Sequence, residues 1–161
     1  MLPTRPSMAV VAMGAIAVLA GCAGPADEKR ALPDDTACVP AAQADPLVGK
    51  WLSVRRESGV SGELKTFFDL RADGTMSYTE QLTRPKRPPQ GLAETGCWRR
   101  DGDAFVLRTL ESNGSPVDTK DPIYQNRYQL TGKAGERLSL RSPDGVKLDA
   151  RRMPPDYRLA W

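Results

Sequence analysis

From residue 47 onward, hydrophobic and polar side chains alternate with a period of two, which is typical of half-buried β-strands. In the segment 64–70, the even-numbered positions are apolar or Thr, whereas Lys65 and Asp69 fall on the other face. The turn signal Asp73-Gly74 follows, and the alternation then resumes. The segments that repeat this pattern are 50–56, 64–70, 76–82, one around Trp98, one around Phe105 and Leu107, 124–130, 138–140 and 146–150.

These eight segments predict an all-β fold without helices, because turn signals separate each strand from the next. Eight consecutive hairpin strands either form an open sheet with two long edges or close on themselves. Closure removes the unpaired edges that invite pairing with other chains. We therefore predict an eight-stranded antiparallel up-and-down β-barrel over residues 46–161.

The connections between the strands are unequal in length, which predicts that the two ends of the barrel differ. Alternate connections of a meander lie at the same end of the sheet. The long connections therefore share an open rim, and tight turns close the opposite end, as in a cup. The tight turns are centred on Gly74, Gly102 and residues 132–135, and the longer loops span residues 57–62, 83–94 and 112–122.

The alternation also predicts which side chains line the cup. Most are apolar, but Glu80 and Asn126 fall on inward faces, and Arg100 is in phase with Trp98. An inward carboxylate or amide needs a partner, which could be a ligand head group, the Arg100 guanidinium or water at the rim. The aromatic side chains equally fit a packed core. The candidate ligand-contact residues are Tyr78, Glu80, Arg100, Tyr124, Asn126 and Tyr128.

The start of the chain has the composition of an export signal. Arg5 precedes an apolar run, Met8 to Leu19, that is shorter than the ~20 residues needed to span a bilayer. The motif Leu19-Ala20-Gly21-Cys22 resembles a bacterial lipobox. The resemblance implies a signal peptide over residues 1–21, acylation of Cys22 and attachment to a membrane through this lipid. An ordinary secretory signal and an uncut membrane anchor are the alternatives.

The lipobox resemblance also implies a location in the bacterial cell envelope. Ala23 follows the acylated Cys, at the position where Asp would retain an enteric lipoprotein in the inner membrane. We therefore expect the outer membrane, with the protein facing the periplasm. Residues 22–45 are rich in Ala, Pro and Asp and predict a linker, the second half of which Cys38 would fix to the barrel.

The 140 residues that remain when 21 of the 161 are removed suit one domain, which we expect to be a monomer. The leader contains only Arg5 among charged residues, so 22 of 23 basic residues remain against 20 acidic ones, a balance of +2. This mild charge, without a recognised motif, argues against a nucleic-acid partner. Residues 84–89 interleave cations with prolines, which fits contact with anionic lipid, contact with a protein, or a solvated rim.

Cys38 and Cys97 form an even pair once Cys22 is lipidated, as expected in an oxidising compartment. A disulfide would close a loop of roughly 60 residues and stabilise the fold by ~4 kcal/mol, and two buried free thiols are the alternative. The chain has no His and no Cys-x-x-Cys pair, so we expect no metal and no cofactor. Without His there is no usual nucleophile and base pair, so we expect no enzyme and assign no catalytic residue.

The segment Asp45 to Trp51 resembles the first strand of lipocalins and lipocalin-like domains, which opens on Gly-x-Trp. The patterns Phe68 to Thr75 and Gly96 to Trp98 resemble the lipocalin-like domains of bacterial lipoproteins. In that family the Trp lies across the closed end and stacks on a basic side chain of the last strand. The resemblance therefore implies that Gly49 and Trp51 close the barrel together with Arg151 or Arg152.

The interior of an eight-stranded barrel is just large enough to be filled by side chains or to take one small ligand, so one hypothesis is that the cup binds a small apolar or amphipathic molecule. The alternative is a protein-interaction module, such as an envelope protease inhibitor, a lysozyme inhibitor or an assembly factor, that acts through loops around a filled barrel. The volume of the internal cavity distinguishes these functions. A cavity of a few hundred Å³ with Glu80 and Asn126 at its mouth would favour a ligand.

Overall fold

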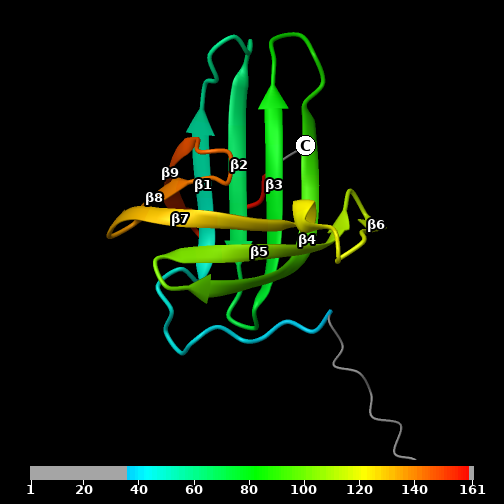
Figure 1. Ribbon diagram of the computed structural model, residues 1–161. Helices are drawn as coiled ribbons and strands as arrows, with labels where there is room; N and C mark the ends of the chain where they lie inside the picture. Colours follow the sequence, from blue (N-terminus) through cyan, green and yellow to red (C-terminus); the bar gives the residue numbers. More distant parts are fainter. Residues whose placement is uncertain (1–35, 160–161) are drawn as a thin grey trace, which may run out of the picture. The chain divides into compact units, whose positions relative to one another are not determined.

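The computed structural model describes residues 36–159, which include a closed antiparallel β-barrel (Figure 1). The predicted lipidation site Cys22 and the predicted signal peptide lie outside this range. Within the described range, no helix is both long and apolar enough to cross a membrane. The elements are β1 Gly49–Arg55, β2 Glu63–Leu70, β3 Thr75–Thr83, β4 Gln90–Asp101, β5 Ala104–Ser112, β6 Ser115–Pro116, the 3-10 helix η1 Pro122–Tyr124, β7 Gln125–Ala134, β8 Arg137–Arg141 and β9 Lys147–Met153.

Consecutive long strands pair with one another, and the last closes on the first. β1 is paired with β2 on one side and with β9 on the other, from Lys50 opposite Met153 to Ser53 opposite Ala150. All the remaining pairs are antiparallel, and β5 bridges β4 and β7. The predicted eight-stranded up-and-down barrel is confirmed, and β6 adds only two residues beside the end of β5.

Two connections at the open end are more structured than the sequence predicts. β4 begins at Gln90, because residues 90–94 pair with β3, so the connection is 84–89 and not the predicted 83–94. Between β5 and β7 the chain forms β6 and η1, a single turn of 3-10 helix capped by the Asp121 side chain. The strand pattern did not predict this turn.

The β4–β5 pair contains a register shift between Thr95 and Gly96. A Cβ on Gly96 would lie 2.0 Å from the carbonyl oxygen of Arg108, so only glycine fits this close approach of the two backbones. A bulge bends its strand and increases the local twist. The lower half of β4 accordingly sweeps sideways and runs with β5 and β7 across the tall strands β1 to β3 (Figure 1).

Inward-facing side chains pack the barrel below its mouth. The ring centroid of Phe68 lies 5.4 Å from that of Tyr78, 5.7 Å from Phe105 and 5.1 Å from Tyr128. Aromatic pairs at these separations stabilise a core beyond the contribution of buried area. The buried core consists of Leu47, Trp51, Phe68, Leu70, Met76, Tyr78, Trp98, Phe105, Leu107, Tyr128, Leu138, Leu140, Leu148 and Ala150.

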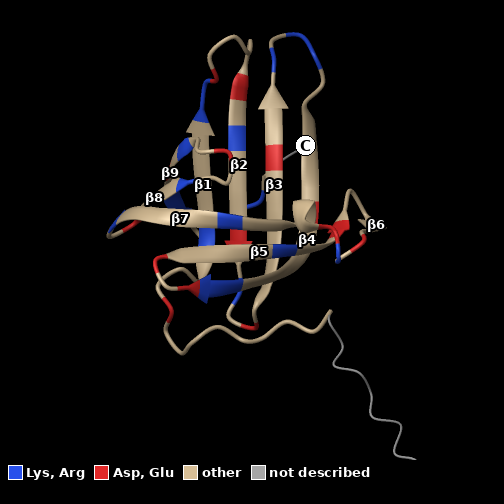
Figure 2. Cartoon of the chain, viewed as in Figure 1, with Lys and Arg blue, Asp and Glu red and all other residues tan. Residues whose placement is uncertain are grey.

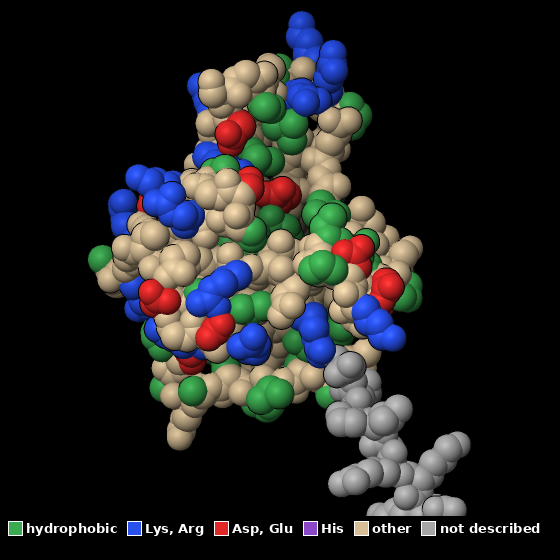
Figure 3. Space-filling model, viewed as in Figure 1, with side chains coloured by type: hydrophobic (Ala, Val, Ile, Leu, Met, Phe, Trp, Pro, Cys, Tyr) green, Lys and Arg blue, Asp and Glu red, His purple; other side chains and the backbone are tan. Residues whose placement is uncertain are grey.

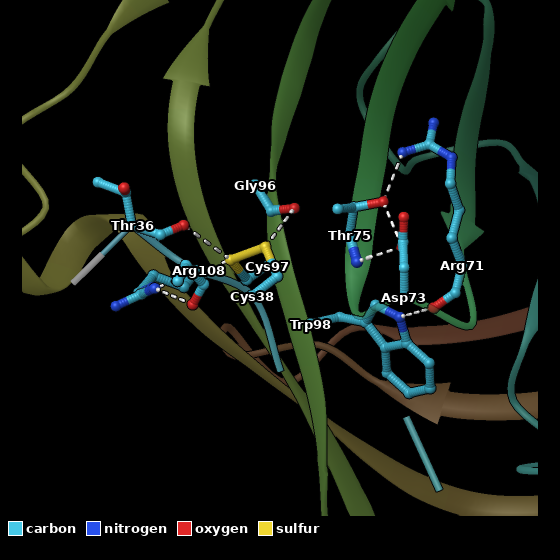
Figure 4. The surroundings of a disulfide bond; sticks show 10 residues. Thr36, Cys38, Arg71, Asp73, Thr75, Gly96, Cys97, Trp98 and Arg108 are labelled. Carbon is cyan, nitrogen blue, oxygen red and sulfur yellow. Dashed lines mark hydrogen bonds between the residues drawn. A yellow bond between two sulfur atoms is a disulfide. The ribbon is translucent and has the colours of Figure 1, made fainter. Parts of the chain in front are cut away.

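The segment that precedes β1 runs along the closed end of the barrel and is held there by a disulfide (Figures 1 and 4). The sulfur atoms of Cys38 and Cys97 are 2.01 Å apart and the Cα atoms 5.1 Å apart, so the predicted disulfide is confirmed. Val39 passes directly over the β2–β3 turn, where a Cβ on Gly74 would lie 2.0 Å from the Val39 carbonyl oxygen. Residues 36–45, the second part of the predicted linker, thus pack against the barrel.

The β2–β3 turn beside this segment is tied to β4 (Figure 4). The indole Nε1 of Trp98 donates to the carbonyl oxygen of Arg71 at 2.8 Å. Within the turn, Asp73 accepts hydrogen bonds from the backbone and the hydroxyl of Thr75. These bonds lower the pKa of Asp73 below its ordinary value.

Trp51 lies fully buried at the closed end, with Arg152 across its ring. The guanidinium carbon is 4.2 Å from the ring centroid, and its two Nη atoms donate to the carbonyl oxygens of Val48 and Pro46, each at 2.8 Å. The indole Nε1 of Trp51 donates to the Leu47 carbonyl oxygen, also at 2.8 Å. Of the two arginines considered above, Arg152 makes this contact, whereas Arg151 is exposed.

The C-terminal segment after β9 covers part of the outer face of the barrel. The Tyr157 ring lies 5.5 Å from the Phe67 ring, centroid to centroid, and Lys50 Nζ donates to the Tyr157 carbonyl oxygen at 2.9 Å. Phe67 faces outward, between the inward-facing Thr66 and Phe68, yet is only 7% exposed. The tail therefore buries an apolar side chain that the alternating pattern alone would leave in water.

We predict that Arg152→Ala lowers the free energy of unfolding by about 2–4 kcal/mol, because it removes a cation–π contact and two charge-assisted hydrogen bonds. The neighbouring Arg151→Ala, which changes an exposed arginine on the same strand, should have an effect below about 1 kcal/mol. Urea denaturation of both variants measures the difference. Equal losses would show that Arg152 does not hold the closed end.

Candidate functional site at the barrel mouth

A cavity of about 210 Å³ opens at the mouth of the barrel, at the end opposite the tight turns. In Figure 3, viewed as Figure 1, acidic side chains lie in a recess of this face among hydrophobic ones. The lining comes from β1, β3, β7, β9 and the β8–β9 connection. It comprises Arg55, Tyr78, Glu80, Asn126, Tyr128, Ser142, Pro143, Asp144 and Leu148.

Two tyrosines form the floor of this cavity. Tyr78 and Tyr128 are 8% and 5% exposed, with ring centroids 6.3 Å apart, and Tyr128 stacks on Phe105 at 5.3 Å. Burial, together with the neighbouring Tyr128 and Glu80, raises the pKa of Tyr78 far above its ordinary value near 10. Burial likewise raises the pKa of Tyr128 to about 12. Both hydroxyls therefore remain protonated at neutral pH and can donate hydrogen bonds.

A polar chain of side chains runs along the wall from β1 to β3. Arg55 Nη1 donates to Thr66 Oγ1 at 2.8 Å, and Thr66 Oγ1 donates to Glu80 Oε1 at 3.3 Å. Arg55 Nη2 also lies 4.0 Å from Glu80 Oε1, and Arg55 Nε lies 3.3 Å from Glu57 Oε2. Glu80 is the one acidic residue of β3. The basic partner of Glu80 is thus Arg55, not Arg100.

The structure brings four of the six candidate ligand-contact residues together: Tyr78, Glu80, Asn126 and Tyr128. Arg100 lies at the closed end instead, because β4 runs from the mouth toward the tight turns. There its Nε donates to the Gly102 carbonyl oxygen at 3.1 Å, and its Nη1 lies 3.5 Å from Asp45 Oδ1. Tyr124 is half-buried at the end of η1 and does not line the cavity.

A second carboxylate lies close to the cavity on β4. Glu94 is 9% exposed and accepts a hydrogen bond from Thr109 Oγ1 at 3.0 Å. Burial raises the pKa of Glu94 above its ordinary value, the Thr109 hydroxyl opposes this shift, and the charge on Glu80 adds to it. The mouth therefore holds two carboxylates, one of which is stabilised in its neutral form.

The β8–β9 connection contributes a third carboxylate. Ser142 Oγ donates to Asp144, and this bond is the main reason that the pKa of Asp144 lies below its ordinary value. Ser142 Oγ also lies 3.1 Å from the Val146 carbonyl oxygen. The sequence marks residues 143–145 as a turn, and the fold places that turn at the edge of the cavity.

These groups equip the mouth for hydrogen bonding and ion pairing. Among residues 36–159, no group of three or more His, Cys, Asp or Glu side chains is arranged to hold a metal ion. In the same range, every buried side-chain nitrogen or oxygen has a hydrogen-bond partner. The polar groups at the mouth are therefore preorganised by their own contacts before anything else binds.

Fold and cavity together define a small, closed antiparallel β-barrel with a packed interior and a charged mouth. No protein-family model matches this chain, and no curated protein matches it. Among solved structures, it is similar to the crystal structure of the Cpx pathway activator NlpE from Escherichia coli, with 19% sequence identity and a TM-score of 0.40. The match covers 70% of this chain and 49% of that chain, so this chain spans about half the length of NlpE.

We predict that Glu94→Gln raises the melting temperature at pH 7 and leaves it nearly unchanged at pH 4. The pKa of Glu94 is higher in the folded protein than in the unfolded chain. As the pH rises above about 4.5, the folded protein therefore keeps the Glu94 proton when the unfolded chain has lost it, and the free energy of unfolding falls. A neutral amide keeps an oxygen that can accept from Thr109 and avoids the buried charge. Thermal denaturation at several pH values measures the effect.

Glu111→Gln is the matched control for this variant. Glu111 also accepts a hydrogen bond from a Thr hydroxyl, from Thr95 at 3.2 Å, but it is exposed on the outside of the same hairpin. Its melting temperature should follow that of the unaltered protein at both pH values. A Glu94→Gln variant that is less stable at pH 7 would show that the charged form of Glu94 is the favoured one.

Proposed function

We propose that this protein is an envelope-anchored lipoprotein that binds a small polar or amphipathic molecule at the mouth of its barrel. The supporting observation is the cavity of about 210 Å³, in which a guanidinium, two carboxylates, an amide and two tyrosines converge over an aromatic floor. Concave sites with a few convergent polar groups are the usual form of ligand sites in barrels. We propose binding and not catalysis as the activity.

The size of the cavity limits the ligand. A volume of about 210 Å³ corresponds to about seven water molecules at ~30 Å³ each. The core below the tyrosines is filled, so a long acyl chain would find no space inside the barrel. The predicted ligand is therefore a small molecule or a head group, with any apolar part lying toward the rim.

The attachment to a membrane is proposed from the motif that ends at Cys22. The described chain meets the barrel at its closed end, where Cys38 is bonded to Cys97. The mouth is formed by the other end of the strands. The proposed site therefore lies at the end of the barrel away from the Cys38–Cys97 bond.

A protein-interaction role is the second candidate, and the β3–β4 connection favours it. Residues 85–89 are all exposed, and Figure 2 shows basic positions in the connection at the tip of this hairpin. Arg84 is held in place by hydrogen bonds to the Ser61 carbonyl oxygen at 3.2 Å and to Gln90 Oε1 at 2.8 Å. An ordered basic loop on a filled barrel fits an inhibitor or assembly factor that binds its partner through the rim.

The anchor can be tested with Cys22→Ala. We expect this variant to leave the membrane fraction while it keeps a β-rich circular dichroism spectrum and the Cys38–Cys97 bond, because the described strands lie between Gly49 and Met153. Cell fractionation with detection in the membrane and periplasmic fractions measures the outcome. Retention of Cys22→Ala in the membrane would contradict lipid anchoring at this residue.

Ligand binding can be tested by native mass spectrometry of the full chain extracted in a neutral detergent. We expect a small molecule bound to the unaltered protein to be lost in Asn126→Phe, which places a large side chain in the cavity. Gln125→Phe changes the preceding, exposed residue of β7, outside the cavity, and should keep the adduct. An unoccupied protein, or an adduct that survives Asn126→Phe, would favour the protein-interaction role.

A further inference from the structure

The mouth cavity carries an excess of negative charge. Its lining contains one basic residue, Arg55, and two acidic residues, Glu80 and Asp144. Glu57 and Glu94 lie immediately beyond, within reach of Arg55 and Glu80 respectively. The hydrogen bond from Ser142 lowers the pKa of Asp144 below its ordinary value and so favours the charged carboxylate. An anionic ligand would meet these carboxylates in a partly dehydrated site, where like charges repel strongly.

The single guanidinium of the lining is already occupied. Arg55 donates to Thr66 at 2.8 Å, lies 3.3 Å from Glu57 and 4.0 Å from Glu80, and its side chain is 20% exposed. An incoming carboxylate or phosphate would have to displace these partners. An incoming cation would instead find free capacity on Glu80 and Asp144, since each carboxylate can accept about four hydrogen bonds.

The floor of the cavity also suits a cation. Tyr78 and Tyr128 line the cavity with ring centroids 6.3 Å apart, one face of Tyr128 is covered by Phe105, and both hydroxyls stay neutral at pH 7. The faces of aromatic rings attract ammonium groups, and tyrosine oxygens accept hydrogen bonds from them. Asn126 adds an amide oxygen from the neighbouring strand β7.

An apolar wall rises from the same site toward the rim. Leu82 is the next inward position after Glu80 on β3, and strand pairing places Leu64 of β2 opposite Leu82 and Leu92 of β4 opposite Glu80. All three leucines are half-buried. A hydrocarbon group attached to a ligand in the cavity could therefore lose contact with water against this wall.

We propose that the mouth site binds a primary amine that carries a short hydrocarbon group, with the ammonium between Glu80, Asp144 and the two tyrosines and the hydrocarbon on the leucine wall. This inference rests on the proposed ligand-binding function and specifies the chemical class of the ligand. Carboxylate and phenol oxygens replace the water that the ammonium loses. The positive charge of the ammonium also neutralises the net negative charge of the cavity lining. Selectivity against acids and alcohols of the same length follows from that charge.

The test compares three probes of equal chain length: butylamine, butyrate and butanol. Each is titrated by calorimetry into the full chain in a neutral detergent at pH 7, and the heat of titration into detergent alone is subtracted. We expect butylamine to bind and the other two to bind at least tenfold more weakly. Glu80→Gln should weaken butylamine about tenfold or more, because a charge-assisted hydrogen bond is lost.

Glu63→Gln is the matched control for Glu80→Gln. It removes one carboxylate from the outer face of the adjacent strand β2, where Glu63 lies 3.8 Å from Lys65. It should change the affinity for butylamine less than twofold. Circular dichroism confirms that each variant is folded, and each should retain the Cys38–Cys97 bond.

The leucine wall is tested by the length of the amine. Replacing methylamine with butylamine should increase affinity by up to about fourfold for each methylene that is buried. Leu64→Ser should remove most of this gain. Val54→Ser, which alters an exposed apolar residue on the outside of β1, should leave it intact.

Two results would overturn the amine assignment in different ways. Binding of butyrate or butanol that is as tight as that of butylamine, or butylamine binding that Glu80→Gln does not weaken, would refute the amine class while the ligand-binding function stands. Failure of all three probes to bind, together with a protein that is unoccupied in native mass spectrometry, would refute both proposals.

Discussion

The pairing of β9 with β1 is the constraint on which the rest of the molecule depends. It closes the sheet, so that alternate side chains of eight strands converge on one axis and must fill a small interior. Four aromatic rings, those of Phe68, Tyr78, Phe105 and Tyr128, take up the space below the mouth. Polar inward positions are then tolerated only near the open end, where water or neighbouring side chains can satisfy them.

The two ends of the barrel differ in how their charged and polar groups are paired. At the closed end, the Arg152 guanidinium lies over the Trp51 ring and donates to two carbonyl oxygens. The Trp98 indole donates to a carbonyl oxygen of the β2–β3 turn. The disulfide also acts here, since it fixes the segment before β1. At the mouth, by contrast, the cavity lining holds two carboxylates, Glu80 and Asp144, and one basic residue, Arg55.

Most of the fold could be predicted because period-two alternation and Gly-centred turns are local signals. The bulge at Gly96 and the extension of β4 back to Gln90 could not, since they arise from partner strands and leave no period in the sequence. Alternation alone cannot tell which end of the barrel a side chain occupies. Arg100 shares the inward face with Trp98 but lies at the closed end, away from Glu80. Arg55 lies two residues after Ser53 on β1, so the alternation places both side chains on the inward face. The direction of β1 would then have placed Arg55 at the mouth. The sequence did not indicate Asp144 as a site residue, because Asp is common in turns, where its side chain bonds to the nearby backbone.

The excess of negative charge at the mouth is a feature that packing alone does not require. Apolar side chains can line the open end of a barrel of this size, as the half-buried leucines of β2, β3 and β4 do here. Partly buried carboxylates near one another cost stability, which the raised pKa of Glu94 expresses. Side chains whose pKa values are shifted by burial and by a neighbouring charge cluster at functional sites. The charge balance of the lining, more than the cavity volume, is therefore the property that supports the proposed binding function.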